Sequence, residues 1–123
     1  MAVGREVEVK ARLQNRALAL AKLAALGSTL SAPIRQKDVV YIIPGESVPT
    51  GPGGIALRLR VQNDRNICTA KQTVSNDLDC IESEFDVSDP EALLTMFQLL
   101  GFEEFCRVSK VRQKATYKNL EIC

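Results

Sequence analysis

Residues Ile55–Val74 read IALRLRVQNDRNICTAKQTV, a stretch that predicts two neighbouring β-strands. Apolar and polar side chains alternate with a period of two over 55–62, which is typical of a β-strand. A second strand is predicted over 67–74. The residues between them, Asn-Asp-Arg-Asn at 63–66, are polar turn formers, so the stretch predicts a β-hairpin. A hairpin here favours a mostly antiparallel sheet.

The segments on either side predict further strands and two helices. Alternating or apolar patterns predict strands over 4–13, 34–43, 80–87 and 104–116. One helix is expected over 15–26, and a second is expected from a Ser88 cap to Leu100, with a buried stripe of Leu93, Leu94, Phe97 and Leu100. Proline and glycine residues, which interrupt helices and strands, are frequent over 44–54 and predict a loop there. Lys118-Asn119 predicts a turn. The fold class is therefore α+β, in a single domain over 1–123.

The composition excludes several classes of function. Sixteen basic residues oppose fifteen acidic ones, and a net charge of +1 disfavours broad attachment to nucleic acid. The chain has no His, which excludes His-based metal sites and Ser–His or Cys–His catalysis. Its four cysteines show no C-x-x-C pattern, and no apolar run reaches the roughly 20 residues of a membrane helix. We expect a cytoplasmic protein with reduced cysteines and no membrane or nucleic-acid partner.

Charged residues occupy alternate positions on several predicted strands. The ordinary explanation for any one strand is the solvated face of a half-buried sheet. The groups that share a strand face are Glu6, Glu8 and Lys10; Arg58 and Arg60; Glu82, Glu84 and Asp86; and Lys110, Arg112 and Lys114, with Lys71 alone between them. Two of these groups, Arg58 with Arg60 and Lys110 with Arg112 and Lys114, are basic blocks of one sign, which repel unless a multivalent counter-ion holds them together.

Two kinds of ligand fit clustered bases beside clustered acids. Arg and Lys bind the oxygens of a polyphosphate through charge-assisted hydrogen bonds. Carboxylates bind a hard cation such as Mg²⁺ or Mn²⁺, usually together with substrate phosphates. The sequence therefore predicts a site for a metal–polyphosphate complex.

At these motifs the chain resembles the CYTH, or triphosphate tunnel, family, which includes class IV adenylyl cyclases, thiamine triphosphatases and inorganic triphosphatases. Its E-x-E-x-K hallmark matches residues 6–10, L-R-x-R matches 57–60, and the lone lysine of the next strand matches Lys71. The acidic strand before a short helix matches 82–87 and 89–92, and the late basic strand matches 110–114. The resemblance implies an antiparallel β-barrel or tunnel with flanking helices, whose charged faces point inward.

The resemblance also implies roles for individual residues. Candidate metal ligands are Glu6, Glu8 and Glu84. Glu82 could belong either to the metal ligands or to the residues around the phosphates. Residues expected to line the phosphate site are Lys10, Arg58, Arg60, Lys71, Lys110 and Arg112. Family members continue past the late basic strand, whereas this sequence stops at Cys123, so we expect the domain to lack the last strands of the tunnel.

Three hypotheses follow for the function. The first is a metal-dependent enzyme that turns over a nucleotide, an organic triphosphate or an inorganic polyphosphate, either by hydrolysis or by cyclisation of a nucleoside triphosphate. The second is a non-catalytic module that binds a polyphosphate or nucleotide. The third is structural, with two chains forming a homodimer that completes the open sheet edge.

Overall fold

The computed structural model describes residues 2–45, 53–76 and 78–123. Six strands form one antiparallel sheet in the order β1-β5-β4-β3-β2-β6, and β7 and β8 form a separate hairpin. The bounds are β1 Ala2–Val7, α1 Arg16–Ala25, β2 Ile34–Ile42, β3 Ile55–Gln62, β4 Arg65–Asn76, β5 Asp79–Asp86, α2 Pro90–Leu99, β6 Glu103–Arg112, β7 Ala115–Tyr117 and β8 Leu120–Ile122. The predicted α+β class is confirmed. The predicted loop at 44–54 falls mainly on 46–52, which lie outside the described residues.

The β3–β4 hairpin has the predicted position. Its two central residues, Asn63 and Asp64, have φ angles of 49° and 60°, and the strands pair from Gln62 with Arg65 onward. Positive φ at both central positions is the geometry of a type I′ turn, whose twist matches that of the flanking strands. Asn and Asp tolerate this conformation better than other side chains that carry a Cβ.

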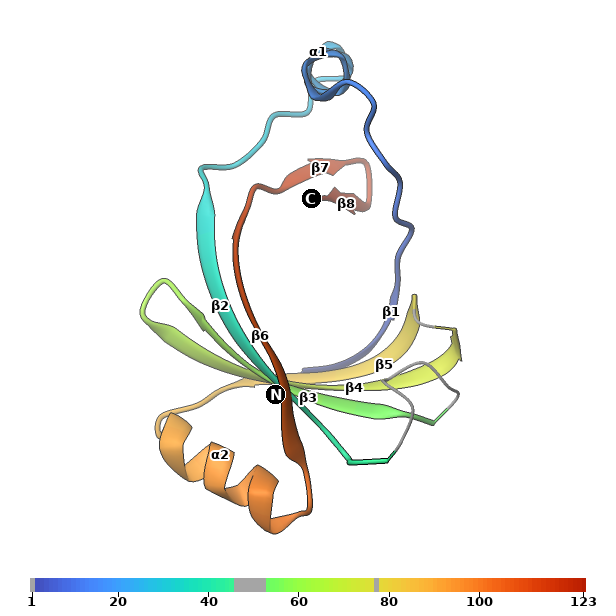
Figure 1. The fold of residues 1–123 in the computed structure, drawn as a ribbon. Coiled ribbons are helices and arrows are strands. Elements are labelled where there is room, and N and C mark those ends of the chain that lie inside the picture. Colours follow the sequence, from blue (N-terminus) through green and yellow to red (C-terminus); the bar gives the residue numbers. More distant parts are fainter. Residues whose placement is uncertain (1, 46–52, 77) are drawn as a thin grey trace.

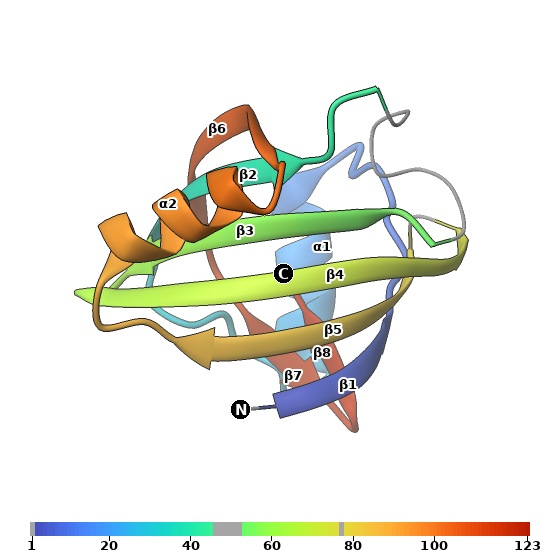
Figure 2. The ribbon, with the colours of Figure 1, turned by 90° about the horizontal axis from the view of Figure 1, so that it is seen from below.

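The hydrophobic core lies between one face of the sheet and α2. Tyr41, Leu57, Leu59 and Cys68 from the strands meet Leu93 and Phe97 of the helix, and the Tyr41 and Phe97 rings lie 5.4 Å apart. Figure 2 shows α2 in front of the outer face of β3. The apolar side chains of the central strands therefore point outward to this helix, and the alternating charged side chains point to the opposite face.

Two details of α2 differ from the prediction. The N-cap is Asp89 rather than Ser88, because the Asp89 carboxylate accepts the Ala92 N–H at 3.0 Å. Leu100 is not part of the buried stripe: it follows the last helical residue as the C-cap and is 63% exposed.

Two predicted strands are shorter than expected because their partner strands end. β1 pairs with β5 only as far as Val7 with Asp79, and one further bond, from Glu8 N to Leu78 O at 2.9 Å, closes the ladder. The predicted strand over 104–116 breaks after Arg112, which is opposite the first residue of β2. The chain then forms β7 and β8 around the predicted turn, where Lys118 has a φ of 54°.

The sheet curves into an open ring (Figure 1). β1 and β6 are its two edges, and within the described ranges no strand pairs them with each other. α2 lies outside the curve, whereas α1 lies across the open side near β7 and β8. No residue of α1 is buried. The arrangement agrees with an unclosed tunnel in which α2, of the two helices in the described residues, covers the apolar sheet face.

Candidate functional site

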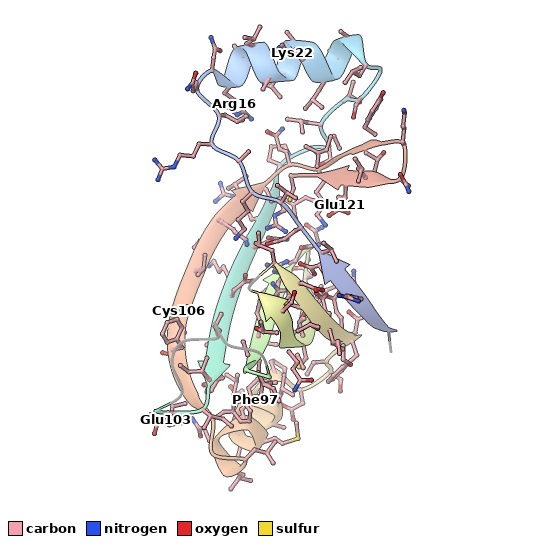
Figure 3. The ribbon with its side chains drawn as sticks, turned by 90° about the vertical axis from the view of Figure 1, so that its right-hand side faces the viewer. Arg16, Lys22, Phe97, Glu103, Cys106 and Glu121 are labelled. Atoms are coloured by element: carbon pink, nitrogen blue, oxygen red, sulfur yellow. The ribbon has the colours of Figure 1, made fainter. Side chains whose placement is uncertain are left out.

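The strand register places charged side chains of all six strands on the face of the sheet opposite α2. Two of them, Arg65 and Asp86, form an exposed ion pair with each other, and we call nine of the others the charged face. Asp38 pairs with Arg60, Arg58 with Thr69, Thr69 with Glu84, and Lys71 with Glu82 across neighbouring strands. Figure 3 shows the sheet between α1, with Arg16 and Lys22 labelled, and α2, with Phe97 labelled. The charged face consists of Glu6, Asp38, Arg58, Arg60, Lys71, Glu82, Glu84, Lys110 and Arg112.

The most buried ion pair of the charged face joins β2 to β3. Arg60 Nε and Nη2 each donate to one carboxylate oxygen of Asp38 at 2.8 Å, and the two side chains are 8% and 4% exposed. Lys110 Nζ from β6 lies 3.9 Å from Asp38 Oδ2. Burial opposes ionisation of Asp38, but the hydrogen bonds and charge of Arg60 outweigh burial, and the pKa of this carboxyl is lowered. Asp38 is thus a carboxylate held among cations.

Arg58 is a partly buried cation whose side chain is only partly satisfied by the described residues. Its Nη2 donates to Thr69 Oγ1 at 3.1 Å and lies 4.0 Å from Glu84 Oε2, and its Nε is buried without a hydrogen-bond partner in the described structure. Burial, followed by the nearby charge of Arg60, lowers the pKa of Arg58. A buried N–H donor without an acceptor is costly, so this position favours an anionic ligand.

Lys71 bridges the two carboxylates at the other end of the charged face. Its Nζ donates to Glu6 at 3.0 and 3.2 Å, and it lies 3.4 Å from Glu82 Oε2, close enough for an ion pair but not aligned as a hydrogen bond. Burial and a hydrogen bond with Glu6 raise the pKa of Glu82 to about 7, while the hydrogen bond from Glu82 lowers the pKa of Glu6 to about 2. Between these two pKa values, and so below about pH 7, the pair therefore holds one proton.

The other predicted site residues lie at the margins of this cluster. Glu84 accepts a hydrogen bond from Thr69 Oγ1 at 3.2 Å. Glu8 and Lys10 follow the end of β1 and form an ion pair at 3.7 Å, with Lys10 79% exposed. Arg112 pairs with Ile34 at the end of β6, and its charge helps to lower the pKa of Lys110 after the larger effect of burial.

The predicted metal ligands do not converge on one point. Across residues 2–45, 53–76 and 78–123, no group of three or more acidic or Cys side chains is arranged to hold a metal ion. Glu6 and Glu82 do meet, however, and they share a proton below about pH 7. Carboxylate oxygens are hard ligands, and Mg²⁺ is usually held by one or two of them with substrate phosphates. The pair therefore fits the expected chemistry of Mg²⁺ or Mn²⁺.

Two residues that contact the predicted site residues were not identified from the sequence. Asp38 was assigned no role, although it is the partner of Arg60 and a neighbour of Lys110. Thr69 is fully buried and links Arg58 to Glu84. The polar residues Gln36 and Asp38 alternate along the predicted strand 34–43, and this pattern was a signal that the strand contributes to the polar face.

Comparison with known proteins identifies one family and several structural neighbours. The chain matches the CYTH domain family over residues 4–123. No curated protein matches it. None of the helices in the described part of the chain is long and apolar enough to cross a membrane.

The structural neighbours share the fold at low sequence identity. The PH1012 protein of Pyrococcus horikoshii is 24% identical with a TM-score of 0.67, over 97% of this chain and 66% of that one. A conserved hypothetical protein of Pyrococcus furiosus is 18% identical with a TM-score of 0.66, over 97% and 66% of the two chains. A candidate adenylate cyclase of Vibrio parahaemolyticus is 14% identical with a TM-score of 0.62, over 93% and 61%. The chain thus spans about two thirds of the length of these neighbours.

Proposed function

The chain belongs to the CYTH domain family, and from that premise we propose that its charged face binds the triphosphate group of a nucleotide or another organic triphosphate. One observation carries the proposal: Arg58 has a buried Nε–H for which the described residues provide no acceptor, on a face that also holds Arg60, Lys71 and Lys110. Phosphate oxygens are strong acceptors of hydrogen bonds from such guanidinium groups.

The proposed phosphate site lies around Arg58, with Lys110 and Arg112 contributing from β6. Lys71 lies nearer to the carboxylates and has Glu6 and Glu82 as neighbours. We propose Glu6 and Glu82, which both contact Lys71, as the carboxylates that would hold a bound Mg²⁺ or Mn²⁺ together with the phosphates. Glu84, predicted as a metal ligand, lies beside Thr69 and Arg58 instead. When bound, the cation would neutralise phosphate charge and orient the leaving group. Glu8 and Lys10, beyond the end of β1, form the outer part of the proposed site.

Two reactions are compatible with such a site. Attack by water on a phosphorus gives hydrolysis, and attack by a ribose hydroxyl on the α-phosphate gives a cyclic nucleotide and pyrophosphate. In both, Arg58 and the neighbouring cations stabilise charge on the phosphoryl oxygens. The alternative is binding of the triphosphate without turnover.

Titration of the protein with tripolyphosphate, with and without Mg²⁺, tests the binding proposal. We expect saturable binding that Arg58→Gln weakens by about 10- to 100-fold, because a hydrogen bond between charged groups is lost. The matched control is Arg107→Gln. Arg107 pairs with Val39 of the core face and is itself exposed, so this variant removes the same charge from the other side of the sheet.

Equal loss in both variants would refute a site centred on Arg58. Turnover is measured separately, as phosphate release from ATP and tripolyphosphate and as cyclic nucleotide formed from ATP. Binding without any of these products would favour the non-catalytic module over the enzyme.

A further inference from the structure

The two arginines of β3 differ in the partners they already have. Both belong to the charged face, and they lie two residues apart on one strand. The guanidinium of Arg60 makes two hydrogen bonds to one carboxylate, whereas that of Arg58 makes one hydrogen bond to a hydroxyl and has a buried Nε–H without a partner. The positive charge of Arg60 is therefore compensated by a hydrogen-bonded carboxylate, whereas the hydrogen bond of Arg58 goes to a neutral hydroxyl.

Arg60 is poorly placed to meet a ligand directly. A planar guanidinium bound bidentately to a carboxylate has its charge compensated and its orientation fixed. Arg60 and Asp38 are both nearly fully buried, so a phosphate would have to compete with the carboxylate without help from water. A phosphate that binds Arg58 would not have to displace a hydrogen-bonded carboxylate. The Arg58 side chain is more exposed, and its nearest carboxylate oxygen lies 4.0 Å away.

Asp38 also reaches the cation on the other neighbouring strand. Its Oδ2 accepts from Arg60 Nη2 and lies 3.9 Å from Lys110 Nζ. Because β2 lies between β3 and β6, one carboxylate is situated between the cations of both strands. Lys110 lies at the longer distance and keeps about a third of its side chain exposed, so it remains able to meet a ligand.

We infer that Asp38 is a positioning residue that withdraws Arg60 from direct ligand contact, so that the triphosphate is held by Arg58 and Lys110. This inference rests on the proposed function, because it states which cations of the charged face meet the ligand. It assigns unequal roles to the two arginines of the L-R-x-R motif: Arg58 binds phosphate, and Arg60 with Asp38 fixes the geometry between β2 and β3.

The decisive variant removes both partners of the pair at once. Asp38→Asn/Arg60→Gln takes away one positive and one negative charge, so the net charge of the face is unchanged, and neither residue is left as an unpaired buried ion. We expect this double variant to bind tripolyphosphate within about threefold of the wild type. Arg58→Gln, measured in the same titration, is expected to lose about 10- to 100-fold.

Single variants separate positioning from simple structural support. Asp38→Asn releases Arg60 and Lys110 from their carboxylate, so tripolyphosphate is expected to bind more tightly than to the wild type, whereas a merely damaged fold would bind it more weakly. Asp38→Glu restores the carboxylate and is expected to return the dissociation constant towards the wild-type value. Circular dichroism at the assay temperature verifies that each variant is folded, and if Asp38→Asn is unfolded, the double variant decides alone.

The outcomes distinguish the inference from the function on which it rests. Absence of tripolyphosphate binding by the wild type overturns both. Wild-type binding with a double variant as weak as Arg58→Gln overturns only the inference, because Arg60 is then a ligand. A folded Asp38→Asn variant that binds more weakly than the wild type overturns it as well.

Discussion

The Arg60–Asp38 pair is expected to contribute strongly to the stability of the fold. Each side chain is nearly fully buried, and two hydrogen bonds of 2.8 Å join them. Removing one partner of such a pair leaves an uncompensated buried charge and typically costs about 3–5 kcal/mol. Since domains unfold with only about 5–15 kcal/mol, one substitution should remove about a fifth or more of the stability. The midpoint of thermal unfolding should fall by on the order of 10 °C.

The two single variants are not expected to be equal. Arg60→Gln leaves Asp38 with Lys110 at 3.9 Å, so some compensation remains. Asp38→Asn leaves two cations without their carboxylate and should cost more. The double variant should be more stable than the sum of the single losses predicts, with a coupling energy of about 2 kcal/mol or more, measured by urea unfolding followed by circular dichroism.

An exposed pair of the same residue types provides the control. Arg65 and Asp86 lie 2.7 Å apart, with side chains 57% and 66% exposed, and they should couple by less than about 1 kcal/mol. If the buried pair couples no more strongly than this one, burial does not determine its energy, and the magnitude above is wrong.

Three further predictions concern the helix and the carboxylate pair. Phe97→Ala should lower the free energy of unfolding by about 3–5 kcal/mol, because Phe97 fills the core, whereas Leu99→Ala, at an 83% exposed position of the same helix, should change it by less than about 0.5 kcal/mol; urea unfolding measures both. Asp89→Ala should cost about 1 kcal/mol through loss of the N-cap, and an equal loss in Ser88→Ala would contradict that assignment. The raised pKa of Glu82 means that the folded state keeps a proton that the unfolded state releases near pH 4.5, so stability should fall as pH rises from about 4.5 to 7. Glu82→Gln should flatten this slope in melting temperatures measured from pH 5 to 8, and an unchanged slope would mean that another group causes it.

Local patterns were sufficient to predict the centre of the sheet. The β3–β4 hairpin depends on neighbouring residues alone, namely alternation over 55–62 and the turn formers Asn63 and Asp64, so its position was predicted correctly. The same alternation predicted which side chains share a face. Even without a known strand order, the sequence therefore indicated that Arg58 and Arg60 belong to one polar surface.

Strand ends and cross-strand partners could not be predicted in this way. β1 stops at Val7 because β5 begins at Asp79, and β6 stops at Arg112 because β2 begins at Ile34. These limits depend on pairing between distant segments, which periodicity does not encode. The role of Asp38 was missed for the same reason, since its cations come from β3 and β6, and the order that places β2 between them is a property of the folded sheet.

The charge balance of the charged face explains why a cation belongs in the proposed function. Asp38 compensates Arg60, and Glu6 compensates Lys71, so the cations with the weakest compensation are Arg58 and those of β6. A triphosphate carries more negative charge than these few cations can neutralise. The proton shared by Glu6 and Glu82 already lowers the negative charge of the face by one, and a divalent cation that displaces it would lower that charge further. Proton and metal therefore compete for the same carboxylates, and metal-assisted binding should strengthen with rising pH while metal-free binding weakens.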